Sequence, residues 1–141
     1  MGIFIASDHA GFELKEYLKN HFDLLDLGTH SAESCDYPVF AKKLIVRLKE
    51  GDRGVLICGT GIGMSIAANR FQNVRAALCF NEEMAVLSRQ HNDANVIVLG
   101  ARMISKEVAR KCVEKFLATD FEGGRHQRRL DLIADGCSNT D

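Results

Sequence analysis

Short and nearly uninterrupted apolar runs recur along this 141-residue chain, and a stretch with helical periodicity follows each of them. The clearest runs occupy positions 55–58, 76–80 and 96–99. Strands that are covered on both faces of a sheet have this pattern. The alternation of such strands with helices predicts an α/β fold built on a parallel sheet.

Five strand–helix units can be placed along the chain. We expect strands over residues 2–7, 24–27, 54–58, 75–80 and 95–99. We expect helices over residues 14–22, 39–48, 62–71, 82–90 and 108–117, with Pro38 in the first turn of the second and Asn81 and Ser105 as caps of the last two. Right-handed crossovers place such helices on both faces, which predicts a Rossmann-like, doubly wound, five-stranded parallel sheet in three layers.

The composition and the continuous pattern indicate one domain over residues 1–141. Apolar residues are 46% and charged residues 26% of the chain, which is typical of a folded globular domain and excludes disorder. We expect a Rossmann-like core over 1–121, then a basic helix and tail over 122–141 that begin at a Gly-Gly joint. A helix that is left over after a complete sheet often packs on a partner subunit, which predicts a homodimer.

Several classes of function are not expected. The net charge of −1 shows no excess of positive charge that would bind nucleic acid. No apolar run approaches the roughly 20 residues that cross a bilayer. The first residues have no basic segment before an apolar run, so no secretory signal is expected. The five cysteines include no C-x-x-C pair, which predicts a protein of the reducing cytoplasm with no metal or redox site.

The loop after the third strand, Cys58-Gly59-Thr60-Gly61-Ile62-Gly63, carries the most chemical information. Ligands of doubly wound sheets bind beyond the carboxyl ends of the strands. Glycines let the backbone aim its N–H groups at an anion, and the following helix adds positive potential. The spacing matches neither G-x-G-x-x-G, because Met64 stands at the third glycine, nor a Walker A loop. We therefore predict a nest for a phosphate or an enolate-like oxyanion.

Side chains at three strand or helix ends are further candidates. Cys58 adjoins backbone N–H groups and a helix N-terminus, which stabilise a thiolate, although a buried strand-end cysteine has the same pattern. Asp8 and His9 follow the first strand, where Asp8 is also a candidate helix cap. His91 follows the fourth helix, at the opposite edge of the sheet, where a helix C-terminal cation is the alternative. From that edge His91 can reach an active site across a subunit interface.

Arginines cluster at positions 125, 128 and 129. Guanidinium groups bind phosphate in a bidentate manner, and a solvated helix face is the alternative. The cluster therefore predicts either a phosphate-binding site or an exposed basic surface.

Six segments in order resemble the ribose-5-phosphate isomerase B family, and together they span nearly the whole chain. They are Asp8-His9-Ala10-Gly11, Asp36-Tyr37-Pro38, and residues 57–63, 65–70, 88–95 and 123–129. The resemblance implies a dimer, or a dimer of dimers, that interconverts ribose 5-phosphate and ribulose 5-phosphate without metal or other cofactor. It also implies active sites that are shared between subunits.

The resemblance assigns roles to individual residues. It makes Cys58 the base that moves a proton between C1 and C2, His91 the acid that helps to open the sugar ring, and Thr60 part of the same proton-handling group. The implied substrate contacts are Asp8, His9, Gly59, Gly61, Ile62, Gly63 and Asn92, with Arg125 and Arg129 on the phosphate and His9 and Arg102 assisting.

Alternatives within and beyond this family remain. One branch carries a glutamate where Met64 stands and lacks the cysteine, so this chain resembles the cysteine-type branch. Galactose-6-phosphate isomerase subunits share the Cys-Gly-Thr-Gly loop but often lack segments like 90–93 and 123–126, which favours the pentose isomerase. The alternatives are an allose- or galactose-type hexose-6-phosphate isomerase and a non-catalytic sugar-phosphate sensor. A sensor needs neither Cys58 nor His91.

Overall fold

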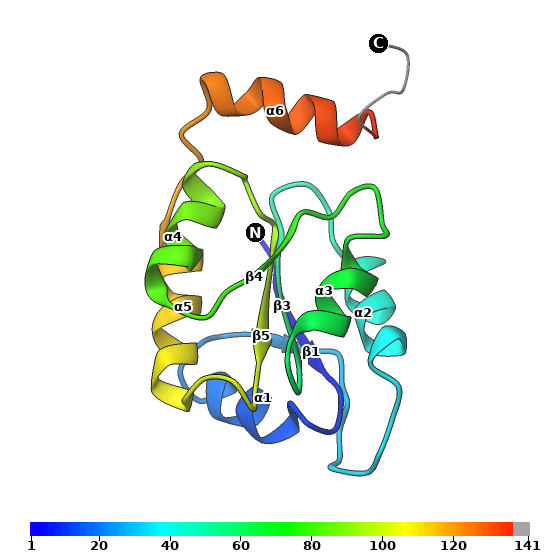
Figure 1. The fold of residues 1–141 in the computed structure, drawn as a ribbon. Helices are drawn as coiled ribbons and strands as arrows, with labels where there is room; N and C mark the ends of the chain where they lie inside the picture. Colours follow the sequence, from blue (N-terminus) through cyan, green and yellow to red (C-terminus); the bar gives the residue numbers. More distant parts are fainter. Residues whose placement is uncertain (137–141) are drawn as a thin grey trace.

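The computed structural model of the protein describes residues 1–136, so that Cys137 lies outside the described residues. Five parallel strands form one sheet in the order β2-β1-β3-β5-β4 (Figure 1). The strands are β1 (Ile3–Ser7), β2 (Leu25–Asp26), β3 (Arg53–Cys58), β4 (Ala76–Leu78) and β5 (Val96–Gly100). The predicted five-stranded parallel sheet is therefore confirmed.

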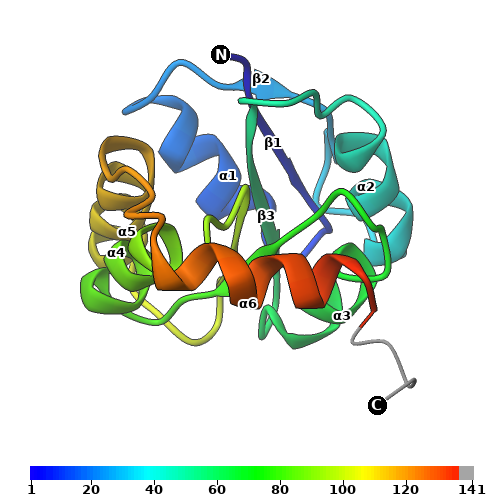
Figure 2. The same ribbon diagram turned by 90° about the horizontal axis from the view of Figure 1, so that it is seen from above.

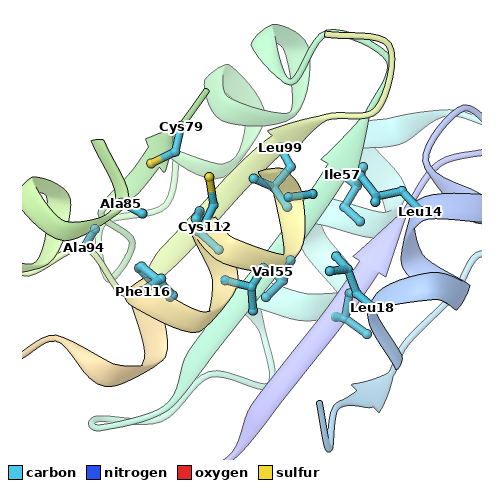
Figure 3. Packing of buried hydrophobic residues seen from close by; sticks show 14 residues of the cluster. Leu14, Leu18, Val55, Ile57, Cys79, Ala85, Ala94, Leu99, Cys112 and Phe116 are labelled. Carbon is cyan, nitrogen blue, oxygen red and sulfur yellow. The ribbon is translucent and has the colours of Figure 1, made fainter. Parts of the chain in front are cut away.

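Helices cover both faces of the sheet, as the doubly wound prediction requires (Figure 1). One face packs on α2 (Tyr37–Ile45) and α3 (Ile62–Ala68), and the other packs on α1 (Phe12–Lys19), α4 (Glu82–Gln90) and α5 (Lys106–Ala118). On the second face Leu18, Val55, Leu99 and Phe116 lie in one buried cluster (Figure 3). Within residues 1–136, no helix is both long and apolar enough to cross a bilayer.

Helices α1, α2 and α3 each end three residues earlier than their apolar periodicity predicts, and local hydrogen bonds explain this at α1 and α3. The backbone N–H groups of Asn20 and His21 turn back to the carbonyls of Tyr17 and Leu18, three residues away, so α1 tightens and ends at Lys19. The predicted helix over 62–71 ends at Ala68 instead. There the Asn69 side chain both donates to and accepts from the backbone of Ala76, at 3.0 and 2.9 Å. Local hydrogen bonding thus overrides periodicity at both helix ends.

The predicted helix starts are confirmed where caps were expected. Asn81 Oδ1 accepts the Met84 N–H at 2.8 Å at the start of α4, and Ser105 Oγ accepts the Val108 N–H at 3.1 Å at the start of α5. Pro38 lies in the first turn of α2, where its missing N–H costs no hydrogen bond.

A charged cluster fastens the short edge strand β2 to α1. Lys15 is fully buried, and its Nζ lies 2.6 Å from Asp26 Oδ2, while Lys19 Nζ lies 2.7 Å from the same atom. Burial alone raises the pKa of the Asp26 carboxyl, but hydrogen bonds from Lys15, Lys19 and the Gly28 amide outweigh it and lower this pKa to about 2. Sequence periodicity did not predict a buried lysine on this helix.

The basic helix predicted after the Gly-Gly joint is α6 (Arg125–Ala134). It crosses the end of the molecule at which the strands begin, reaching from the α4–α5 side to the α3 side (Figures 1 and 2). Leu130 is its buried anchor, and Gln72 donates to the Ala134 carbonyl at 3.4 Å. Leu132 and Ile133 remain exposed. The packing of α6 on a partner subunit stays a prediction.

Candidate active site

The ends of β1 and β3 meet at the point where the strand order reverses, which is where doubly wound sheets bind ligands. Asp8 follows β1, and its N–H donates to the carbonyl of Ile57 in β3 at 3.2 Å. The Asp8 carboxylate accepts the Gly11 N–H at 3.1 Å. Asp8 thus closes the turn before α1, whose N-cap is Gly11 with no side-chain cap. The Asp8 side chain therefore caps the turn that leads into α1 and not the first turn of the helix itself, and its contact with a substrate stays a prediction.

His9 is oriented by the loop that precedes α2. The backbone N–H of Cys35 donates to His9 Nδ1 at 3.2 Å, and the Cys35 thiol lies 4.0 Å from the same nitrogen. Because Nδ1 accepts a hydrogen bond, the neutral imidazole carries its proton on Nε2. His9 therefore presents an N–H donor at its other ring nitrogen.

Cys58 is the last residue of β3 and is 5% exposed. The backbone N–H of Gly61 donates to Cys58 Sγ at 3.2 Å. Gly61 is the N-cap of α3 and has a φ of +80°, a left-handed conformation that glycine adopts without strain. The loop therefore turns an amide donor onto the sulfur, as the sequence predicted.

The other glycines of this loop lie under large side chains. A Cβ on Gly59 would stand 2.7 Å from the Arg102 guanidinium, and a Cβ on Gly63 would stand 2.6 Å from the Tyr37 ring. Arg102 is held over the loop because its backbone N–H donates to the Gly59 carbonyl at 2.9 Å. A cation and a phenol thus lie against the backbone beside Cys58. Tyr37 belongs to a segment that carried the family resemblance, but it was not predicted as a site residue.

Thr60 projects from the same loop with its hydroxyl oxygen already engaged as an acceptor. The Ile62 N–H donates to Thr60 Oγ1 at 3.2 Å, so the hydroxyl hydrogen stays available to donate. Ile62 itself is 54% exposed at the start of α3. Met64, by contrast, is fully buried in the cluster between α2, α3 and the sheet, so it contributes packing.

His91 lies at the other end of the sheet. It is the C-cap of α4, and the following strand, β5, begins beside the start of β3, whereas Cys58 pairs with the last residue of β5. Its ring stacks on that of His126 in α6, with centroids 4.4 Å apart and planes inclined by 16°. His126 is a candidate site residue that the sequence did not predict, because only the return of α6 over this end brings the two rings together.

The turn after His91 is held by two arginines. Arg89 is 3% exposed, and its guanidinium donates to Asp93 Oδ1 at 2.8 Å, to the Ala94 carbonyl at 2.8 Å and to the Thr119 carbonyl at 3.1 Å. Arg75 Nε donates to the Asp93 carbonyl at 2.7 Å. These contacts hold Asp93 at a φ of +46°, which is uncommon for a residue with a side chain. The position of Asn92, between His91 and Asp93, is fixed in consequence.

The linker to α6 is fastened to the same place. The Glu122 N–H donates to the Gln90 carbonyl at 3.1 Å, next to His91. Arg125 and Arg129 follow on α6, exposed and four residues apart on one helix. His91, Asn92 and the α6 arginines therefore form a second group of predicted residues at the end where the strands begin.

The sequence-predicted residues thus form two groups in one chain. Asp8, His9, the loop 58–63 and Arg102 gather where the strands end, while His91, Asn92, Arg125 and Arg129 lie at the opposite end. Among the other cysteines within residues 1–136, Cys35 lies beside His9, whereas Cys79 and Cys112 lie in the buried core. Burial raises the pKa of the Cys79 thiol to about 12 and that of Cys112 to about 11, so both behave as core residues, as predicted.

The profile of the Ribose/Galactose Isomerase family matches residues 3–133. The chain belongs to this family. It is 44% identical over 138 residues to the ribose-5-phosphate isomerase B of Escherichia coli, covering 93% of each chain. Within the family, the solved ribose 5-phosphate isomerase of Thermotoga maritima is 51% identical with a TM-score of 0.88, covering 95% of this chain and 97% of that one.

Another family member was solved with a ligand. The ribose-5-phosphate isomerase B of Mycoplasma genitalium, with bound ribulose-5-phosphate, is 42% identical with a TM-score of 0.89, covering 99% of this chain and 97% of that one. The resemblance drawn from the six sequence segments is therefore confirmed.

Proposed function

We propose that this Ribose/Galactose Isomerase family member interconverts ribose 5-phosphate and ribulose 5-phosphate by proton transfer through an enediolate, with no metal or other cofactor in the reaction. The observation that carries the proposal is the 3.2 Å hydrogen bond from the Gly61 amide to Cys58 Sγ at the switch point of the sheet. It combines a sulfur base with backbone donors in one loop. Two relatives that each align with more than 90% of the chain are named ribose-5-phosphate isomerase B, which supports the same reaction.

The reaction moves one proton between two carbons and another between two oxygens, and it needs one base for the carbon-bound proton. From the open-chain aldose, Cys58 as thiolate removes the proton on C2, the electron pair of that C–H bond forms the C1–C2 double bond, and the oxygen on C1 takes the negative charge. The same sulfur then returns the proton to C1 as the carbonyl forms on C2. A proton moves from the oxygen on C2 to the oxygen on C1 at the same time. Thr60 is suited to this second transfer because Ile62 occupies its acceptor side and leaves its hydrogen free.

The oxyanion of the enediolate needs donors that are fixed before the reaction. The amides of the loop 59–63 and the guanidinium of Arg102 supply these donors. Their positions are fixed because Gly59 packs against Arg102 and Gly63 against Tyr37. Asp8 and His9 complete the contacts to the sugar or its phosphate, with the His9 Nε2 proton as donor.

The site is completed by a second copy of the chain in this proposal. Cys58 and His91 lie at opposite ends of one sheet, so no single chain offers both to one five-carbon sugar. In a homodimer, or a dimer of dimers, His91, Asn92, Arg125 and Arg129 of one protomer reach the Cys58 loop of the other. Exposed apolar side chains near both groups, Ile62 and Ile66 on α3 and Ile133 on α6, support such an interface. His91 then helps to open the ring, and the arginines hold the phosphate.

A reducing compartment suits this chemistry, and we place the enzyme in the cytoplasm. Cys35, Cys58, Cys79 and Cys112 are all free thiols.

The test is a turnover assay with EDTA-treated protein and ribose 5-phosphate, following ribulose 5-phosphate. We expect rapid turnover in the unmodified chain and none in Cys58→Ala, which keeps the fold and still binds the sugar phosphate. Turnover of Cys58→Ala near that of the unmodified chain would remove Cys58 from the mechanism.

The same assay separates the alternatives. A kcat/KM that is larger for allose 6-phosphate or galactose 6-phosphate than for ribose 5-phosphate would make the protein a hexose-phosphate isomerase. Binding of ribose 5-phosphate in a thermal-shift assay, without turnover of any of the three, would make it a sugar-phosphate sensor.

A further inference from the structure

Three potential metal ligands meet where α4, the α5–α6 linker and α6 converge. One ligand atom from each of His91, Glu122 and His126 lies within 4.8 Å of the other two. His126 Nε2 lies 3.8 Å from Glu122 Oε1. The cluster is anchored, because the Glu122 N–H bonds to the Gln90 carbonyl at 3.1 Å and the two imidazoles stack at 4.4 Å.

Two imidazoles and one carboxylate are a common ligand set for zinc with an open fourth position. Ligand atoms of a tetrahedral zinc stand about 3.3 Å apart, so rotations that move these atoms by roughly 1–2 Å would enclose the ion. Because an imidazole binds a metal in the plane of its ring, at least one of the two stacked rings must turn out of the stack to do so. The Glu122 side chain, which is 52% exposed, can follow that movement. Carboxylate–imidazole sets favour zinc over magnesium or calcium, which prefer oxygen ligands.

We propose that His91, Glu122 and His126 form a reversible site for Zn²⁺, and that the bound ion inhibits the isomerase by occupying the imidazole of His91. The inhibition rests on the proposed function, in which His91 opens the sugar ring, whereas the binding does not. No role in the reaction itself falls to the ion.

The surroundings decide how tightly the ion is held. Arg125 and Arg129 place two guanidinium charges near His126, on the same helix α6. The same arginines repel the ion, and they oppose the permanent occupancy that structural zinc sites have. The site is therefore suited to reversible binding.

Binding is tested on the full chain carrying Cys58→Ala, which removes the thiol of the catalytic loop. Calorimetric titration with Zn²⁺ is compared with and without Glu122→Gln, and with Glu114→Gln as the matched control, since Glu114 is an exposed carboxylate on α5. We expect Glu122→Gln to weaken binding by at least about tenfold and Glu114→Gln to leave it unchanged. Equal Zn²⁺ affinity in the Glu122→Gln and Glu114→Gln proteins would overturn the site.

Two further readouts complete the test. Co²⁺ bound to the full chain should show the weak visible bands of nitrogen and oxygen ligands, and a sulfur charge-transfer band would place the metal on cysteine instead. With Cys58 intact, half-inhibition of isomerisation by Zn²⁺ should need at least about tenfold more ion in Glu122→Gln than in Glu114→Gln. Equal inhibition would overturn the regulatory role. A chain without turnover in EDTA would refute the proposed function and leave the binding result standing.

Discussion

Arg89 donates to Asp93 Oδ1 at 2.8 Å, and this contact fixes the turn that carries His91 and Asn92. Through the Thr119 carbonyl, at 3.1 Å, the same guanidinium also fixes the end of α5. The linker to α6 starts there. One buried side chain therefore sets the relative positions of His91 and the arginines of α6.

Replacing Arg89 should harm both stability and catalysis. Arg89→Met leaves two carbonyls and part of the Asp93 carboxylate without a donor, which should lower the free energy of unfolding by about 2–4 kcal/mol. Because the His91 turn loosens, kcat should fall as well. Urea unfolding and steady-state kinetics measure the two effects. The control is Arg110→Met, whose 3.8 Å contact with Glu114 is partly exposed and should contribute less than about 0.5 kcal/mol. Equal stability of the two variants would refute the argument.

The phosphate-binding role of α6 predicts a split between the two kinetic constants. Arg129→Ala should raise KM for ribose 5-phosphate more than it lowers kcat, because the phosphate is remote from the carbons that react. Arg110→Ala removes the same charge on α5 and should change neither constant. If KM of Arg129→Ala equals that of the unmodified chain, α6 does not hold the phosphate.

Substitution of two glycines that have nearly the same φ distinguishes the cost of backbone strain from the loss of the amide donor to Cys58. Gly61 has a φ of +80° and Gly51 a φ of +89°, but a Cβ on Gly61 would overlap the Leu78 side chain, whereas Gly51 faces open space. Either alanine should cost about 1–2 kcal/mol for its left-handed backbone. Only Gly61→Ala should also displace the amide that donates to Cys58 and abolish turnover. Full activity in folded Gly61→Ala would show that this donor is dispensable.

The pKa of Asp26 predicts a stability change in acid. Because this pKa is about 2 in the folded chain and 3.8 is its ordinary value, the unfolded chain binds more protons between these values. The stabilisation, about 2 kcal/mol, is complete above about pH 5 and is lost as the pH falls toward 2. The difference in unfolding free energy between the unmodified chain and Asp26→Asn should therefore shrink over that interval. A constant difference from pH 5 to pH 2 would contradict the assignment.

The sequence predicted those parts of the fold and site that depend on neighbours along the chain. Apolar runs located β3 and β5, and the rule that parallel strands end at one edge brought Asp8 and Cys58 together. Other features depend on distant segments. The His91–His126 stack needs the return of α6, the Tyr37–Gly63 contact needs α2 to pack on α3, and buried Lys15 needs Asp26 on β2. Periodicity carries none of this information, which is why these features were not predicted.

Complementation between two inactive variants tests the central claim of a Cys58 site that is completed by a partner. Cys58→Ala and His91→Asn are unfolded together, mixed in equal amounts, refolded and assayed for ribose 5-phosphate isomerisation. Half of the dimers are then mixed, and each has one site with both residues intact, so about a quarter of the activity of the unmodified protein should return. Mixtures that stay as inactive as either variant alone, although an affinity tag on one variant retains the other, would contradict the shared site.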